Sequence, residues 1–296
     1  MPVVLDKGNL RNRINSKLGD LVANLLGQRM NYLLRYYSHR HRFPNFKHPK
    51  DLSERILSAM LKKEFLQNAD YADKVKVREY IVQKGLGNIL LKQFGNWESA
   101  EEIDFSGLPD KFILKANNGS GGHVICTDKS LLNIPETVTR INKTLHEVRH
   151  LRNTEPHYCC IKPQILCEEL LGDGITLPVD YKFHCIRGHI ADIFVVCERE
   201  DGAKYCTLDT KWEVLPYTLP QYMPKTKPKK PENLDEMIRI AEKLSEDFEF
   251  VRVDLYDFEG KIYFGELTFS PWGGIMNSYT TEALEILGSK FEKSND

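Results

Sequence analysis

The chain has 296 residues, which suffices for one large domain or for two to three smaller lobes around a cleft. Hydrophobic residues make up 41% of it, an ordinary share for a globular core. No run of 18 apolar residues appears, so no transmembrane helix is expected. The N-terminus shows no apolar stretch followed by a small-residue cleavage site, so we expect a cytoplasmic protein. Seven cysteines form no CxxC pair, which favours free buried thiols over a metal or disulfide framework.

The near-zero net charge hides a basic N-terminal segment. Residues 1–50 hold 10 Lys or Arg against 2 Asp, a balance of +8, so the rest of the chain carries 31 against 40, or −9. Apolar positions at helical spacing over 16–38 predict an amphipathic helix with Ser16 as its cap. We favour packing of this helix on the main body. The alternative is peripheral contact with an anionic glycan or with the inner face of the membrane.

The next part of the chain predicts helices and one short strand. The expected elements are a helix over about 51–67 capped by Asp51 or Ser53, a helix over about 73–85, and the strand NILLKQF. The acidic, turn-rich stretch NWESAEEIDFSGLPD then indicates a loop and a lobe boundary.

From Lys111 onward the pattern predicts mainly strands. They are FILKA, HVICT, ILCEEL, DYKFHCIR, HIADIFVVCER, KYCTLD, VRVDLYDF and KIYFGELTF, with a tight turn between the last two. Helices are expected over about 135–152 and 232–246. The segment QYMPKTKPKKPENL indicates a solvated loop rather than a nucleic-acid site. The sequence therefore predicts an α+β chain with a largely antiparallel sheet.

Charged residues gather on the last two predicted strands. Side chains two positions apart share a face of a strand, so Arg252 lies beside Asp254 and Glu266 beside Thr268. A carboxylate pair on a half-buried sheet is unfavourable unless a cation compensates it. Two facing carboxylates with a guanidinium beside them suit magnesium and a polyphosphate.

A glycine-rich loop, Lys115 to Gly122, joins two predicted strands. It lacks GK[ST] and does not open a helix, which excludes a Walker A loop. Its backbone N–H groups can still cover phosphates, with Lys115 supplying positive charge. The alternative is a simple turn.

These motifs together resemble those of an ATP-grasp enzyme: Lys115 before a glycine flap, then CEELL, then RVD, ELT and PWGG. The segments DKVKVREYI, KPQILCEELL, DYKFHCIRG and VDLYDFEGKIYFGELTFSPWGG are similar to the TupA-like ATP-grasp group, which is associated with bacterial surface-polysaccharide synthesis. The motifs span about 73 to 274.

The resemblance implies an ATP-grasp fold in which two α+β lobes clasp ATP, with an added helical basic N-terminal segment. The expected divisions are a helical segment 1–68, an N-terminal lobe 69–110 and ATP-grasp lobes 111–296. Within the last, a glycine-flap lobe covers about 111–170 and a C-terminal metal and acceptor lobe about 171–296.

The resemblance also implies how ATP is held. Lys115 and Lys74 would bind its phosphates, residues 168–171 would run along adenine through their backbone, and Asp180 would accept a bond from ribose. The implied nucleotide-binding residues are Lys74, Lys115, Gly119, Ser120, Gly121, Gly122, Glu168, Glu169, Leu171 and Asp180. The alternatives are a solvated helix lysine for Lys74, a surface strand end for 168–169, and a cross-strand ion pair for Asp180 and Lys182.

The implied reaction centre lies on the strands around Asp254. Asp254 and Glu266 would hold two Mg²⁺, and Thr268 replaces the Asn that many ATP-grasp enzymes have as a third, stronger ligand. Lys182 would contact the γ-phosphate or an acyl phosphate, and Arg252 would stabilise the oxyanion. The substrate-binding residues would be His184, Ser270, Gly273 and Gly274; for His184 a packed core histidine is the alternative.

The function implied is an ATP-dependent carboxylate–amine ligase that forms an amide through an acyl phosphate. Its substrates would be an amino acid and a uronic-acid carboxylate of a capsular or cell-wall polysaccharide or its precursor, with no nucleic-acid partner. A kinase acting on a sugar hydroxyl and a non-catalytic ATP-binding scaffold are the alternatives. A glycosyltransferase would usually show a DxD motif, and the sequence has none.

Overall fold

The computed structural model describes residues 23–119, 121–146, 154–174, 178–198 and 203–292. The chain divides into two compact units. Unit 1 comprises Glu64–Tyr80, Leu90–Leu177 and the described part of Met1–Asn31, and unit 2 comprises Tyr32–Lys63, Ile81–Ile89 and the described part of Pro178–Asp296. The lobe limits expected from the sequence stay a prediction.

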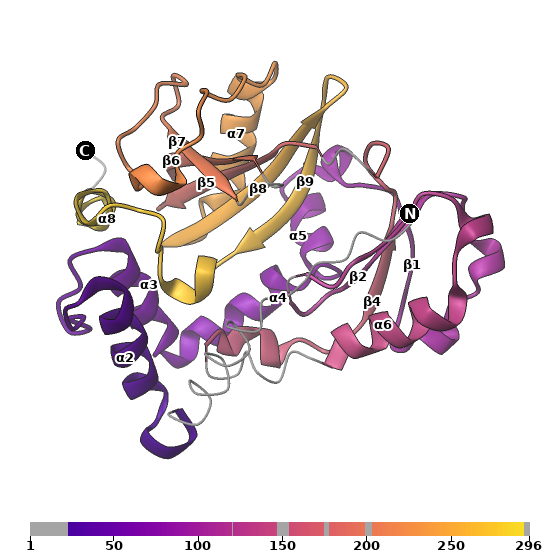
Figure 1. The fold of residues 1–296 in the computed structure, drawn as a ribbon, viewed down its shortest axis with the longest axis horizontal. Helices are drawn as coiled ribbons and strands as arrows, with labels where there is room; N and C mark the ends of the chain where they lie inside the picture. The colour runs from indigo at the N-terminus through magenta and orange to yellow at the C-terminus, as the bar shows by residue number, and fades with distance from the viewer. Residues whose placement is uncertain (1–22, 120, 147–153, 175–177, 199–202, 293–296) are drawn as a thin grey trace. The chain divides into compact units, whose positions relative to one another are not determined.

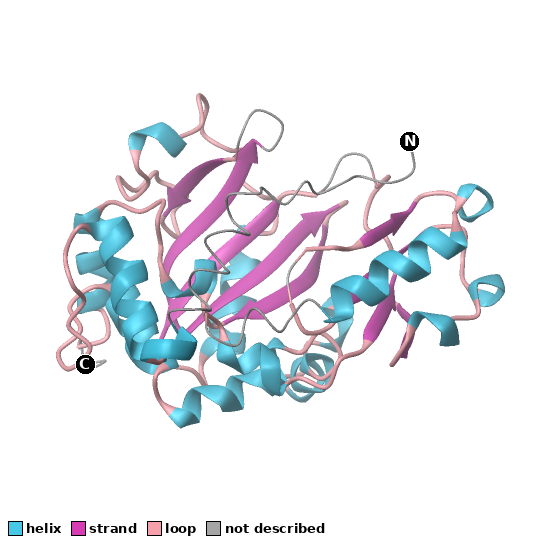
Figure 2. Cartoon of the chain, turned by 60° about the horizontal axis from the view of Figure 1, so that its bottom comes forward, coloured by secondary structure: helices cyan, strands magenta, loops and turns pink. Residues whose placement is uncertain are grey.

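Unit 1 is built on a four-stranded antiparallel sheet in the order β1-β4-β2-β3. Its strands are β1 (Gln93–Trp97), β2 (Phe112–Ala116), β3 (Val124–Cys126) and β4 (Ile165–Glu168). The helix α6 (Ile134–His146) packs against β2 and β3 (Figure 2). Alternate residues of β2 are buried in a core shared with α6, so Lys115 points to the other face of the sheet.

Unit 2 is built on a five-stranded antiparallel sheet in the order β7-β6-β5-β8-β9 (Figure 1). Its strands are β5 (Asp180–Ile186), β6 (His189–Glu198), β7 (Lys204–Leu208), β8 (Phe250–Phe258) and β9 (Lys261–Thr268). The amphipathic helix α7 (Leu234–Ser245) packs on β5, β6 and β8. It covers the face that carries Cys185, whose Sγ lies 3.9 Å from the Ala241 carbonyl oxygen. The residues that alternate with this apolar set lie on the opposite face.

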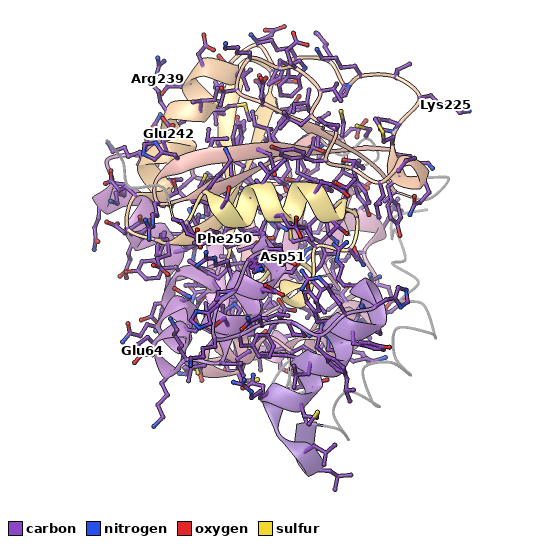
Figure 3. The ribbon with its side chains drawn as sticks, turned by 90° about the vertical axis from the view of Figure 1, so that its left-hand side faces the viewer. Asp51, Glu64, Lys225, Arg239, Glu242 and Phe250 are labelled. Carbon is purple, nitrogen blue, oxygen red and sulfur yellow. The ribbon has the colours of Figure 1, made fainter. Side chains whose placement is uncertain are left out.

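Further α-helices of the described residues lie outside these two sheet-and-helix assemblies. They are α2 (Gln28–Arg40), α3 (Leu52–Met60), α4 (Ala69–Ala72), α5 (Val77–Gln83) and α8 (Thr281–Ser289). Asp51 caps α3 by accepting a 2.8 Å bond from the Glu54 N–H. Tyr36 and Arg42 also bond to the Asp51 carboxylate, and α8 passes beside Asp51 in Figure 3. Asp51 therefore ties α2, α3 and the segment between them together.

The structure confirms most predicted strands and corrects several helix boundaries. The helix expected over 51–67 ends at Met60 and is followed by a 3₁₀ helix, Lys63–Asn68. The helix expected from Asp73 begins only at Val77, because the Asp73 carboxylate accepts bonds from two following N–H groups and forms a turn.

Near the N-terminus, residues 16–22 of the first predicted helix lie outside the described residues. The described part is interrupted at Gly27, whose φ is +86°, and continues as α2 to Arg40. The predicted strand NILLKQF is wrong in its first half, where Gly87–Ile89 forms a 3₁₀ turn, and α8 was not predicted.

The structure also bears on the expectations for the cysteines, the Lys-rich segment and membrane-spanning helices. All seven cysteines are free, as expected, but Cys159 and Cys160 are exposed rather than buried. Lys225 lies on the exposed loop before α7, as predicted for that Lys-rich segment (Figure 3). Within the described residues, none of the helices has the length and apolar character needed to span a membrane.

Gly288 of α8 generates a prediction about the stability of unit 2. A Cβ at this position would lie 2.1 Å from the Lys50 carbonyl oxygen and 2.7 Å from the Asp51 Cα, so α8 must move away from the start of α3. We expect Gly288→Ala to lower the free energy of unfolding by about 1–3 kcal/mol in a urea titration. The exposed neighbour provides the control: Ser289→Ala should change it by less than about 0.5 kcal/mol. Equal stability of both variants would contradict this packing.

Candidate functional site

Unit 2 carries a row of charged residues across three neighbouring strands. Lys182 of β5 pairs in register with Asp254 of β8, which pairs in turn with Glu266 of β9. Arg252 lies two residues before Asp254 and pairs with Thr268. Residues that are opposite or two apart share a face, so all five side chains lie on the face that α7 does not cover. The face-sharing predicted for Arg252, Asp254, Glu266 and Thr268 is confirmed.

Asp254 is the centre of this cluster. Its Oδ1 accepts a 2.6 Å bond from Arg252 Nε, and its Oδ2 accepts bonds of 2.7 Å from Arg252 Nη2 and 2.5 Å from Lys182 Nζ. Arg252 Nη2 also donates to Glu266 Oε1 at 2.8 Å, and Lys182 Nζ donates to Asp180 Oδ2 at 2.5 Å. Three carboxylates therefore face two cations, which leaves one negative charge in excess.

Burial governs the electrostatics of the cluster. Burial lowers the pKa of the Arg252 guanidinium, but Asp254 and Glu266 outweigh this effect and raise that pKa above its usual value, so Arg252 stays charged. Burial also raises the pKa of the Asp254 carboxyl, against the opposing effect of Arg252 and Lys182. An added cation would favour the ionised carboxylates.

An unsatisfied oxygen marks one edge of the cluster. Asp180 Oδ1 is buried and has no hydrogen-bond partner within the described part of the chain, although Oδ2 of the same carboxylate bonds to Lys182. Buried polar atoms are normally hydrogen-bonded, so this oxygen has the chemistry of an acceptor for a hydroxyl donor. The cross-strand ion pair given as the alternative is present between Lys182 and Asp254, whereas the Lys182–Asp180 contact lies within β5. The free oxygen of Asp180 also suits the expected ribose contact.

The donor set also bears on magnesium. Among the described residues, no group of three or more His, Cys, Asp or Glu is placed to hold a metal ion by itself. Asp254 and Glu266 face each other across β8 and β9, and the Thr268 hydroxyl lies 3.0 Å from Glu266 Oε1. Mg²⁺ is typically bound by one or two carboxylates together with substrate phosphates. The residues present therefore fit Mg²⁺ that arrives with a polyphosphate.

His184, predicted to bind substrate, lies in a fully buried network. Its Nδ1 lies 2.8 Å from Asp192 Oδ1 and 3.2 Å from the Tyr279 hydroxyl, which donates a 3.0 Å bond to Asp192. Burial and Asp192 raise the pKa of Tyr279 well above its usual range, so the hydroxyl keeps its proton. These contacts fit the packed-histidine alternative, and the predicted substrate contact of His184 stays a prediction.

The segment that follows β9 has an unusual backbone. Trp272, Gly273 and Gly274 have φ values of 50°, 63° and 83°, and a non-glycine residue in this region is strained. Arg35 of α2 donates a 3.3 Å bond to the Gly273 carbonyl oxygen, and a Cβ on Gly273 would lie 2.7 Å from that guanidinium. Ser270, which opens this turn, is buried. The acceptor-binding role predicted for Ser270, Gly273 and Gly274 stays a prediction.

In unit 1, Lys115 lies beside a carboxylate that a second cation also contacts. Lys115 Nζ donates a 2.9 Å bond to Glu168 Oε2, and Arg78 Nη1 donates a 2.8 Å bond to Glu168 Oε1. The Glu168 side chain is thus buried between two cations, not at a surface strand end as the alternative had it. Glu169, next along the chain, donates its N–H to the Lys92 carbonyl oxygen at 2.9 Å, and Leu171 is half-buried.

The glycine flap is fixed at both of its ends. Lys74 Nζ donates a 2.6 Å bond to the Gly119 carbonyl oxygen, which brings the two predicted residues together. At the far end, a Cβ on Gly122 would lie 2.4 Å from Thr144 Oγ1 of α6. Gly121 and Gly122 both have positive φ, which glycine adopts at no steric cost. Ser120, also predicted to bind the nucleotide, lies outside the described residues.

Three residues at these sites were missed by sequence reasoning. Arg78 contacts Glu168 across 90 residues of sequence, and no local pattern indicates that contact. Asn117 is fully buried at the base of the flap, where its amide donates to Asp73 Oδ1 at 2.9 Å. Gly265 forms a bulge in β9, and a Cβ there would lie 3.0 Å from the Asp254 carbonyl oxygen. A glycine inside the strand KIYFGELTF is a signal that could have found this bulge.

Solved structures similar to this chain include three enzymes at 10–14% identity. The ATP-grasp ligase PsnB complexed with minimal precursor is 14% identical, with a TM-score of 0.41 over 79% of this chain and 63% of that chain. D-alanine–D-alanine ligase from Bacillus anthracis is 14% identical, with a TM-score of 0.44 over 77% of this chain and 69% of that chain. N5-carboxyaminoimidazole synthase from Aspergillus clavatus, in complex with ADP and 5-aminoimidazole ribonucleotide, is 10% identical, with a TM-score of 0.42 over 70% of this chain and 46% of that chain. The alignment thus spans less than two thirds of PsnB. A comparison with curated proteins gave no match. The family model described as TupA-like ATPgrasp matches residues 54–292, which is most of the chain, and the chain therefore belongs to the TupA-like ATP-grasp family.

Proposed function

We propose that the protein is an ATP-dependent carboxylate–amine ligase. The observation that carries this proposal is the row Lys182–Asp254–Glu266 with Arg252 beside it, in a chain of the ATP-grasp family. The row combines facing carboxylates suited to magnesium with two cations suited to phosphate and to a developing oxyanion. Phosphoryl transfer depends mainly on positioning and charge stabilisation, so this cluster needs no side-chain nucleophile.

In this proposal two lysines and one backbone segment provide the phosphate and adenine contacts of the nucleotide. Lys115 would bind α- and β-phosphate oxygens, and Lys74, which bonds to the Gly119 carbonyl oxygen in the flap, would also reach the phosphates. The backbone of 168–171 runs along adenine. The buried free oxygen of Asp180 would accept a bond from the ribose.

Bound magnesium would supply positive charge to the phosphates of ATP. Asp254 and Glu266 would hold it, with Thr268 as a weaker third ligand, and we propose two ions. Lys182 bonds to Asp254 and Asp180 in this structure, and in the reaction it would turn toward the transferred phosphoryl group.

The proposed chemistry has two steps. An oxygen of the substrate carboxylate attacks the γ-phosphorus, the bond between that phosphorus and the β,γ-bridging oxygen breaks, and ADP leaves. An amine nitrogen then attacks the acyl carbon, the C–O bond to phosphate breaks, and an amide, inorganic phosphate and one proton result. Arg252 stabilises the oxyanion that forms in the second step, because its guanidinium stays charged at any working pH.

For the substrates we propose an amino acid and a uronic-acid carboxylate of a surface saccharide or its precursor. The support is the association with surface polysaccharides that the sequence resemblance implies, and the basic N-terminal segment, which has the charge to hold an anionic saccharide. The proposed place of action is the cytoplasm, where the basic N-terminal segment could also contact the inner face of the membrane.

The direct test measures ADP release by the purified protein with Mg-ATP, a uronic-acid saccharide and pooled amino acids, with the product mass recorded. We expect ADP release to require both substrates, and the product to gain the mass of an amino acid minus water. ADP release without an amine, with a phosphate on the saccharide, would instead show a kinase. Nucleotide binding without any turnover across a broad panel of carboxylates and amines would favour a scaffold.

The metal assignment predicts the effect of single substitutions. Asp254→Asn and Glu266→Gln should each lower kcat by at least about 100-fold, because each removes a charge whose interaction with the metal contributes several kcal/mol. Glu259→Gln, an exposed acid in the turn of the same hairpin, is the matched control and should keep wild-type kcat.

Removing the Asp254 charge also leaves the buried Arg252 with a weaker partner and lowers stability. Glu266 is more exposed, with 30% of its side chain accessible, so Glu266→Gln tests the chemistry with less effect on folding. Wild-type turnover in a folded Glu266→Gln variant would overturn the metal assignment.

A further inference from the structure

Glu168 accepts one hydrogen bond on each carboxylate oxygen from two different cations. Oε2 takes the Lys115 ammonium at 2.9 Å, and Oε1 takes the Arg78 guanidinium at 2.8 Å. Less than a fifth of either cationic side chain is accessible, so solvent screens these contacts only in part. A third bond, of 2.8 Å, joins Arg78 Nη2 to the Leu91 carbonyl oxygen.

The strand register explains why Glu168 and Lys115 meet. Lys115 pairs with Leu166 on β4, and Glu168 lies two residues further along that strand, so the two side chains share a face. Arg78 approaches from α5, outside the sheet. Its planar fork is held at two points, by Glu168 and by the backbone just before β1, which fixes its orientation.

We propose that Arg78 is a positioning residue of the nucleotide site, which acts through Glu168 to orient Lys115 toward the phosphates of ATP. In this proposal the Glu168 carboxylate holds Lys115, while the backbone of 168–171 runs along adenine. This inference rests on the proposed function only in that it requires ATP to bind at Lys115.

Charge provides the physical reason for a second cation. A Lys115–Glu168 pair alone has no net charge, so a phosphate would have to compete with the carboxylate for the ammonium. With Arg78 the three groups carry +1, and Glu168 is saturated on both oxygens. Lys115 has three N–H donors, so one can remain on Glu168 while the others reach phosphate oxygens. Arg78 thus lets Glu168 hold Lys115 in place without cancelling its attraction for ATP.

The test is a calorimetric titration of the full chain with Mg-ATP and, separately, with adenosine. We expect Arg78→Gln to weaken ATP binding by about 10-fold or more, in line with the effect of losing a residue that orients a ligand-binding group. The affinity for adenosine should stay within about 2-fold of the wild-type value, because adenosine has no phosphate for Lys115 to bind. Arg78→Lys should be intermediate, since an ammonium cannot reproduce the fork.

Two further variants separate positioning from general charge and from stability. Lys76→Gln removes one positive charge two residues away, where it pairs with the exposed Asp70, and should leave ATP affinity unchanged. When Glu168→Gln is already present, Arg78→Gln should reduce ATP affinity much less than it does alone. The reason is that the effects of residues that act through one another are not additive. Thermal unfolding of each variant monitors the fold, and Arg78→Lys serves if Arg78→Gln does not fold.

Each outcome decides the inference. Wild-type ATP affinity in Arg78→Gln, an equal loss for adenosine, or full additivity with Glu168→Gln would overturn it. A wild-type chain that does not bind Mg-ATP overturns both this inference and the proposed function. ATP binding that depends on Arg78, in a protein that fails the ligase assay, would refute the ligase chemistry and support the positioning role.

Discussion

The interaction on which the larger sheet's chemistry depends is the contact of Asp254 with Arg252 and Lys182. A buried carboxylate is unfavourable alone, and this one is compensated by a bidentate guanidinium on its own strand and an ammonium on the neighbouring strand. The strand register makes that compensation achievable, because Lys182 lies directly opposite Asp254. Removing Arg252 or Lys182 would raise the excess negative charge of the cluster from one to two, so the buried carboxylates depend on both cations.

The same alternation that places the charges also stabilises the sheet beneath them. Along β5 and β8 every second residue is apolar and packs under α7, so the polar residues between them are held on the opposite face at fixed spacing. The bulge at Gly265 re-aims β9 next to Asp254, and only a residue without a side chain fits there comfortably. The reaction centre proposed here is thus placed on rigid strands, whereas the flap and the turn after β9 depend on glycine conformations and on side chains of other elements.

Sequence reasoning succeeded where the physics is local. The period-2 pattern of VRVDLYDF and KIYFGELTF places Arg252, Asp254, Glu266 and Thr268 on one face without reference to the rest of the chain. It failed where contacts with residues distant in sequence determine the structure. Helix α5 starts late because Asp73 bonds to its own turn and to Asn117. Glu168 is buried because Arg78 contacts it from another element. His184 shows the same limit, since alternation places it on the charged face but cannot show that Asp192 and Tyr279 enclose it.

Opposite net charges distinguish the two clusters, and this difference accounts for their proposed division of roles. In unit 1, Arg78, Lys115 and Glu168 sum to +1, a charge that attracts a polyphosphate. In unit 2, Asp180, Lys182, Arg252, Asp254 and Glu266 sum to −1, which attracts a metal ion. Each cluster contains ion pairs that lower the cost of burial and one charge that remains uncompensated. Each excess is complementary to one component of Mg-ATP: the positive cluster of unit 1 suits the polyphosphate, and the negative cluster of unit 2 suits the metal ion.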